Sequence, residues 1–122
     1  MPTEYTALVA ALKALTQGET PNVKTLPMAE SEWNTRPEGD SYGTVTLDFE
    51  TKALYADDLK VLIAYNGAVD LFSKKRDGDG WVPGITGVLT AHCDSAWSLN
   101  SHQYERETGL FHWEWTFDIG EG

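Results

Sequence analysis

The sequence predicts a single α+β domain, residues 1–122, in which two helices pack on one face of a mainly antiparallel β-sheet. Three observations predict this class. Apolar residues recur at helical spacing near the N-terminus, apolar and polar residues alternate in two later stretches, and a second helical stretch lies between those two. A chain of 122 residues suits one domain and can bury roughly two-thirds of its unfolded surface.

Residues 4–17 are predicted to form an amphipathic helix. Thr3 can cap its N-terminus, and Glu4 lies in the first turn, where the helix dipole favours a negative charge. The apolar residues at helical spacing are Tyr5, Leu8, Val9, Leu12 and Leu15. Gly18 predicts the end of the helix, and the apolar stripe predicts packing against the sheet.

Residues 20–42 are polar and contain three of the five prolines, at positions 21, 27 and 37. A short edge strand is predicted within residues 23–28, because proline is tolerated at sheet edges. Trp33 lies in this polar region. Such a tryptophan either pins a loop to the domain or anchors an interface, and both interpretations stay open.

Residues 44–55 and 60–73 predict a long, twisted β-hairpin whose turn includes residues 57–58. The first of these strands has apolar residues at alternate positions: Val45, Leu47 and Phe49. Residues 66–67, Asn-Gly, interrupt the second strand and predict a bulge or bend there.

Residues 81–92 predict the second helix, and residues 96–119 predict a C-terminal β-hairpin. The helix has Trp81, Ile85, Val88 and Leu89 on one face. Every second residue at the end of the hairpin is large and apolar: Phe111, Trp113, Trp115, Phe117 and Ile119. In a β-strand these side chains share one face, and burial of each is worth roughly 1.5–3 kcal/mol. Gly109 can adopt the positive φ that such a turn often needs.

The composition excludes several classes of function. A net charge of −10 argues against ordinary nucleic-acid binding and against anionic membrane surfaces. We find no secretory signal and no apolar run long enough to span a bilayer. The single cysteine, Cys93, excludes an intrachain disulfide framework and fits a reducing compartment. These features predict a cytoplasmic single domain.

No motif predicts catalysis, a cofactor or a metal site. The sequence lacks GxSxG, Walker-type, HExxH and CxxC patterns. The spacing of His92, Cys93, His102 and His112 is unlike that of common zinc ligands. Asp77-Gly-Asp79-Gly resembles the start of a calcium loop but lacks its later ligands. We therefore predict that the protein is not an enzyme.

Five segments stand out when they are taken together: Asp70-Leu71-Phe72-Ser73, the Lys-Arg-Asp loop that follows it, the predicted helix that begins at Trp81, residues 97–105 and residues 108–115. Together they resemble the tail-terminator (tail-completion, minor tail) proteins of long-tailed bacteriophages. The order of helix, extended hairpin, helix and C-terminal hairpin is also similar to the lambda-type tail terminator, and the resemblance is best over residues 44–119. It implies a ring, expected to be a hexamer, that caps the tail tube and provides the surface for head joining.

The resemblance also implies partners and a location. The partners are further copies of the chain, the tail-tube protein and the head-neck proteins, and DNA passes through the lumen without specific binding. The protein would be made in the bacterial host cytoplasm and reside in the virion tail or neck.

Three residues are predicted at the interface between subunits: Leu54, Tyr55 and Tyr65. The long hairpin exceeds what one small core can cover, so its surplus length is available to a neighbouring subunit in a head-to-tail ring. The alternative is that these side chains are buried within their own subunit.

Four acidic residues are predicted to line the lumen: Asp57, Asp58, Asp77 and Asp79. Like charge discourages DNA from adhering to the wall of a channel.

Other functions stay open at this point. A different phage neck or connector protein would have similar features. An acidic inhibitor that mimics DNA would explain the charge, although the acidic residues are scattered. A carbohydrate-binding β module would explain the five tryptophans but needs aromatic rings exposed on a sheet face.

Overall fold

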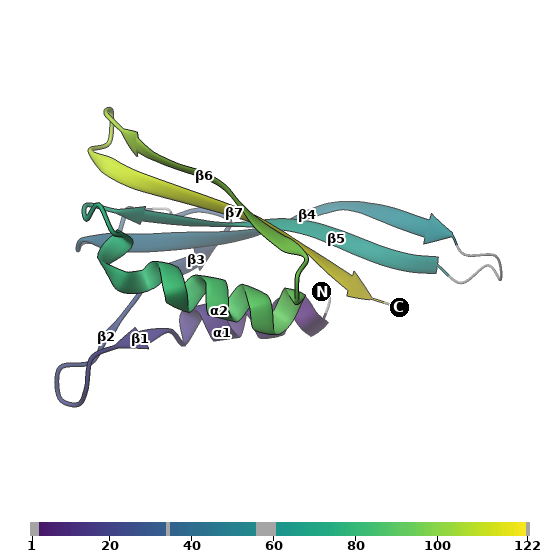
Figure 1. Cartoon of the computed structure of the whole chain (residues 1–122), viewed down its shortest axis with the longest axis horizontal. Coiled ribbons are helices and arrows are strands. Elements are labelled where there is room, and N and C mark those ends of the chain that lie inside the picture. The colour runs from purple at the N-terminus through teal and green to yellow at the C-terminus, as the bar shows by residue number, and fades with distance from the viewer. Residues whose placement is uncertain (1–2, 34, 56–60, 122) are drawn as a thin grey trace.

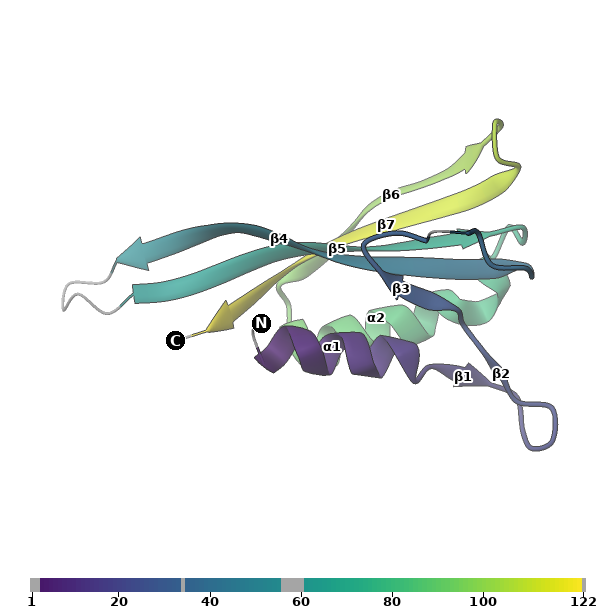
Figure 2. The ribbon, with the colours of Figure 1, turned by 180° about the vertical axis from the view of Figure 1, so that it is seen from behind.

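The protein folds into a five-stranded β-sheet with two helices on one of its faces, as Figure 1 and the reverse view in Figure 2 show. The computed structural model describes residues 3–33, 35–55 and 61–121, and their side chains except in residues 48–55, 61–64 and 120–121. The helices are α1 (Thr3–Lys13) and α2 (Trp81–Cys93), and a 3₁₀ turn, η1 (Gly78–Gly80), precedes α2. The strands are β1 (Thr16–Gln17), β2 (Lys24–Thr25), β3 (Met28–Glu30), β4 (Ser41–Tyr55), β5 (Val61–Ser73), β6 (Trp97–Glu105) and β7 (Leu110–Glu121). The predicted α+β class is confirmed.

The strands of the main sheet lie in the order β3-β4-β5-β7-β6. All neighbours are antiparallel except β3 and β4, which run parallel. Parallel neighbours need a connection that returns along the sheet. Residues 31–40, here called the crossover loop, make that connection. β1 and β2 form a separate two-stranded ribbon, so the edge strand predicted within residues 23–28 is divided between β2 and β3.

The core lies between the helices and one face of the sheet, here called the covered face. β7 contributes Trp113, Trp115, Phe117 and Ile119, all at most 3% exposed, while Phe111 is half-buried against the same cluster. The helices contribute Tyr5, Leu8, Val9, Leu12, Trp81, Ile85, Leu89 and Cys93. The alternation in the sequence therefore predicted correctly which side of β7 is hidden.

β4 and β5 form the predicted long hairpin, which extends past the ends of both helices in Figure 1. The irregularity expected at residues 66–67 lies instead in the partner strand, between Asp48 and Lys52. Gly67 pairs regularly with Leu47. The reason for glycine is packing, because a Cβ at this position would lie 2.3 Å from the ring of Phe117.

α1 ends earlier than the predicted residues 4–17. Its last residue is Lys13, and Gln17 instead pairs with Lys24 in the β1–β2 ribbon. Gly18, with a φ of +88°, lies in the turn of that ribbon rather than at the end of the helix. Pairing of the segment that follows the helix thus overrides the helical pattern that continues to Leu15.

α2 matches the predicted helix to within one residue, and its buried face is the predicted one apart from Val88, which is half-buried. In the described part of the chain, neither helix combines the length and the hydrophobicity needed to cross a membrane.

Candidate functional site

The sheet edge formed by β6 is unpaired and almost free of charge. β6 is the last strand of the sheet, and its neighbour is β7. Residues 97–104 contain no Asp, Glu, Lys, Arg or Pro. Leu99 is 47% exposed and Tyr104 is 53% exposed. Soluble proteins commonly protect such edges with charges, proline or bulges. Here the irregular pairing between Leu99 and Ser101 gives limited protection, so this edge is a candidate for pairing with another chain.

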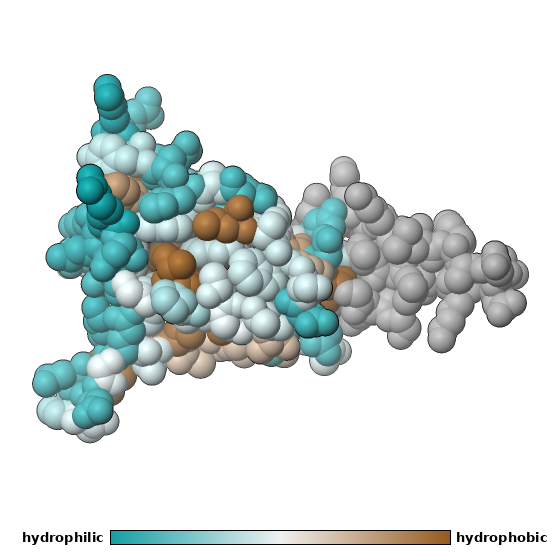
Figure 3. Space-filling view, viewed as in Figure 1, coloured by the Kyte–Doolittle hydropathy of each residue, from teal (hydrophilic) through white to brown (hydrophobic). Residues whose placement is uncertain are grey.

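Aromatic rings extend the covered face toward the tip of the β6–β7 hairpin. His102 stacks on Trp113 with ring centroids 4.3 Å apart, and Tyr104 lies 4.9 Å from Phe111. His102 and Tyr104 are nevertheless exposed. Figure 3 shows patches of hydrophobic surface over the part of the molecule where β6 and α2 lie. The β6 edge therefore combines free backbone groups with exposed apolar side chains.

The opposite edge of the sheet is also largely unpaired. β3 covers β4 only from Gly43 to Val45, and β4 continues beyond it to Tyr55. The predicted interface residues Leu54 and Tyr55 belong to this extension, but their side chains lie outside the described ones. Tyr65 is half-buried and packs against the core of its own subunit.

The face of the sheet that points away from the helices, here called the open face, is acidic. Cross-strand partners lie on the same face, so the register assigns the open-face residues of β5, β6 and β7. Its carboxylates are Asp70, Glu105, Glu114 and Asp118. Among the described side chains of the five strands, no lysine or arginine lies on this face. The remaining residues are mostly small or uncharged.

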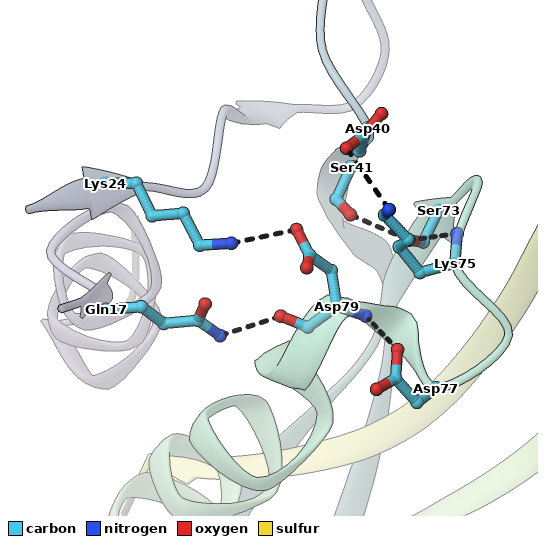
Figure 4. A network of polar contacts seen from close by, with 8 residues as sticks. All are labelled: Gln17, Lys24, Asp40, Ser41, Ser73, Lys75, Asp77 and Asp79. Atoms are coloured by element: carbon cyan, nitrogen blue, oxygen red, sulfur yellow. Dashed lines mark hydrogen bonds and ion pairs between the residues drawn. The ribbon is translucent and has the colours of Figure 1, made fainter.

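Two of the predicted lumen residues support the start of α2 (Figure 4). Asp77 Oδ1 accepts a hydrogen bond of 2.9 Å from the backbone N–H of Asp79. The Asp79 carboxylate lies 3.0 Å from Lys24 Nζ, and its carbonyl accepts a 3.0 Å bond from Gln17 Nε2. Asp79 thus joins the β1–β2 ribbon to η1 and has a cation beside it. Asp57 and Asp58 lie outside the described residues.

The same close-up shows how the neighbouring end of the β4–β5 hairpin is held together. The hydroxyl groups of Ser41 and Ser73 lie 2.8 Å apart in a buried position, and Ser73 Oγ accepts a hydrogen bond from the backbone N–H of Lys75. Lys75 Nζ also lies 4.0 Å from Asp40. These contacts fix the end of the sheet from which the crossover loop enters β4.

A groove lies between the crossover loop and the open face. The Trp33 indole N–H donates a 3.0 Å hydrogen bond to the Gly43 carbonyl, so Trp33 pins the loop to the domain, one of its two predicted roles. Arg36 lies over the ring of Tyr42, and Tyr42, Phe72 and His112 form a stack across three strands. Sequence analysis did not find this groove, because nothing local brings the loop against β4 and β5.

The histidines and Cys93 do not converge on one point. The described residues hold no group of three or more His, Cys, Asp or Glu side chains placed to bind one metal ion. Burial, with smaller effects from Asp118 and Glu4, raises the pKa of Cys93 to about 11. The thiol is therefore protonated at neutral pH, whereas a nucleophilic cysteine needs its thiolate.

The aromatic residues of the sheet leave few free ring faces. Trp113 and Trp115 are buried, as the sequence predicted. On the open face, Tyr42 has Arg36 on one side and Phe72 on the other, and Phe72 stacks on His112. Rings stacked on one another present edges to solvent, whereas carbohydrate recognition uses ring faces.

Searches against protein-family models and against curated protein sequences find no match for this chain.

Proposed function

We propose that this protein is a structural subunit of the tail or neck of a long-tailed phage. It assembles into a ring that caps the tail tube and provides the surface for head joining. The observation that carries the proposal is the presence of open strand edges on opposite sides of the sheet, on β4 and β6. A contact between two different edges is head-to-tail, and repeated head-to-tail contacts close into a ring when the rotation between subunits permits it.

The two edges suit one another in length and chemistry. β6 has nine residues, and β4 extends beyond β3 from Thr46 to Tyr55. Main-chain hydrogen bonds between such edges provide affinity, and the exposed side chains of Leu99 and Tyr104 add apolar contact area. The ring contact is thus expected at the β6 edge in addition to the hairpin residues predicted from the sequence.

The open face suits the wall of a DNA channel. If sheets continue from one subunit to the next, one face of the joined sheet points inward. Asp70, Glu105, Glu114 and Asp118 would then line the channel, because the helices occupy the other face. Carboxylates repel the phosphates of passing DNA.

The first experiment measures assembly. Light scattering and negative-stain imaging of the purified protein, with and without tail tubes, should detect a closed ring or a cap on tube ends. A protein that stays monomeric at all concentrations and never binds tube ends would overturn the proposal.

A matched pair of variants tests the β6 edge. Leu99→Lys adds a charge to the edge, whereas Ala91→Lys adds the same charge to an exposed position on α2. Leu99→Lys should abolish assembly while the unfolding midpoint stays unchanged, and Ala91→Lys should assemble normally. Equal assembly by both variants would exclude β6 from the contact.

The acidic open face also favours a second candidate, an inhibitor that competes with DNA for a host enzyme. That candidate predicts a monomer that is displaced from a nuclease or polymerase by added DNA. Ring formation without such competition distinguishes the structural role.

A further inference from the structure

The groove beside the crossover loop is a formed pocket with walls from two separate parts of the chain. Its volume is about 370 Å³, within the range typical of ligand sites. The loop provides Ser31, Glu32, Trp33 and Arg36, and the open face of β4 and β5 provides Tyr42, Thr44, Asp70 and Phe72. The pocket is distinct from both strand edges that carry the ring proposal.

The walls of the groove are held in place before any ligand arrives. The hydrogen bond from Trp33 to the Gly43 carbonyl fixes one wall. On the floor, the rings of Tyr42 and Phe72 stack with centroids 5.0 Å apart and an interplanar angle of 16°. Phe72 in turn stacks on His112 at 4.2 Å. A preformed site loses little conformational entropy when it binds a ligand.

Asp70 is held at the same floor. His112 Nε2 lies 2.7 Å from Asp70 Oδ1, and both side chains are less than one-fifth exposed. A carboxylate only accepts hydrogen bonds, so Nε2 carries the proton of this contact. His112 therefore contacts only one of the two carboxylate oxygens of Asp70, and the other oxygen takes no part in this contact.

The charges and rings of the groove favour a cation. The charged groups that line the groove are two carboxylates, those of Glu32 and Asp70, and one guanidinium, that of Arg36. Within the described residues, Glu32 has no cation within ion-pair distance. The Arg36 guanidinium lies 5.6 Å from the centre of the Tyr42 ring, so the groove already holds one cation against an aromatic ring.

We propose that the groove binds an arginine side chain of a partner protein. The flat guanidinium lies against the edges of the stacked rings, and the carboxylates of Glu32 and Asp70 accept its N–H groups. The chain itself carries a net charge of −10, so a basic segment is also drawn to it over longer distances. This proposal goes beyond ring assembly and does not depend on it.

The test uses the signal of the Trp33 indole N–H in ¹⁵N-labelled protein, assigned with a Trp33→Phe variant. The probe is N-acetyl-arginine amide, and two analogues serve as controls. The citrulline analogue has a similar planar shape without the charge, and the lysine analogue has the charge without a planar group. Only the arginine compound should give a large, saturable shift of the Trp33 signal. An equal shift with the citrulline or lysine compound would overturn the proposal.

Two glutamate-to-glutamine variants, one in the groove and one far from it, test whether the arginine compound binds beside Glu32. Glu32→Gln should weaken binding of the arginine compound by about threefold, the size expected of an exposed charge contact. Glu107→Gln, the same change in the exposed β6–β7 turn, should leave binding unchanged. Arg36→Ala should strengthen binding, because it removes a like charge and frees a face of Tyr42. Equal binding by the two glutamine variants would place the ligand elsewhere.

Discussion

The two faces of one sheet differ completely although the same strands form both. In β7, Trp115 is fully buried beneath the helices, whereas the next residue, Thr116, points to the open face. The covered face holds the large apolar side chains, and the open face holds carboxylates, small polar residues and a stack of aromatic rings. Stability is therefore concentrated on one face, which leaves the other face free for recognition.

Substitution of neighbouring residues in β7 tests this difference most strongly. Trp115→Ala should lower the free energy of unfolding by about 3–5 kcal/mol, because it leaves a large cavity in the core. Thr116→Ala removes the 2.9 Å hydrogen bond from Asn100 Nδ2 and the 3.4 Å contact with the Ser98 hydroxyl, and should cost about 1 kcal/mol. Urea denaturation followed by circular dichroism measures both values. Similar losses for the two variants would contradict the unequal roles of the faces.

Two glycine substitutions sharpen the comparison, because an added Cβ has no room at Gly67 and open space at Gly87. A Cβ at Gly67 would meet the Phe117 ring and the Thr46 carbonyl at 2.3 and 2.6 Å, so Gly67→Ala should destabilise by about 1–3 kcal/mol. Gly87 lies in α2 with nothing within 4 Å of the added atom. Gly87→Ala should stabilise by up to about 1 kcal/mol through helix propensity. Thermal unfolding of both variants measures the sign, and stabilisation by Gly67→Ala would refute the close approach of Phe117.

The pH dependence of the free energy of unfolding tests whether the covered face surrounds the Cys93 thiol with apolar groups. Its pKa is raised to about 11 in the folded protein from an ordinary value of 9.0. Between these values the unfolded chain has lost the thiol proton while the folded chain retains it. The stability that the neutral thiol contributes is therefore present below pH 9 and is lost as pH rises toward 11. The loss is at most about 3 kcal/mol, because each unit of difference in pKa is worth roughly 1.4 kcal/mol.

The measurement is urea denaturation at several pH values between 8 and 11 for the natural protein and Cys93→Ala. The natural protein should lose more stability than the variant over this range, since other titrating groups are common to both. Parallel curves would show that the thiol is not held in an apolar environment.

The smallest effect is expected where the open face meets the crossover loop. Trp33→Phe removes the hydrogen bond to the Gly43 carbonyl and should cost about 1 kcal/mol. Amide exchange at residues near the loop should increase, while exchange in α1 and α2 should not change. Increased exchange in the helices would show that Trp33 supports the core rather than the loop alone.

The candidate assembly site was predictable only in part. The long hairpin follows from the alternating residues of its first strand and from the turn signal at residues 57–58, so its existence could be read from the sequence. The open β6 edge could not, because the order of strands in the sheet depends on which segments meet. The acidic open face had a sequence signal, since His112, Glu114, Thr116 and Asp118 alternate with the buried residues of β7.

The sequence by itself determined the two helices and the four long strands, and the buried face of most of them, because helix and strand periods are local properties of the chain. Only the tertiary structure decided contacts between distant segments. Lys24 meets Asp79 across 55 positions, and the crossover loop brings Trp33 and Arg36 to the stack on β4 and β5. Such contacts depend on how whole elements pack, so no local pattern encodes the groove that they form.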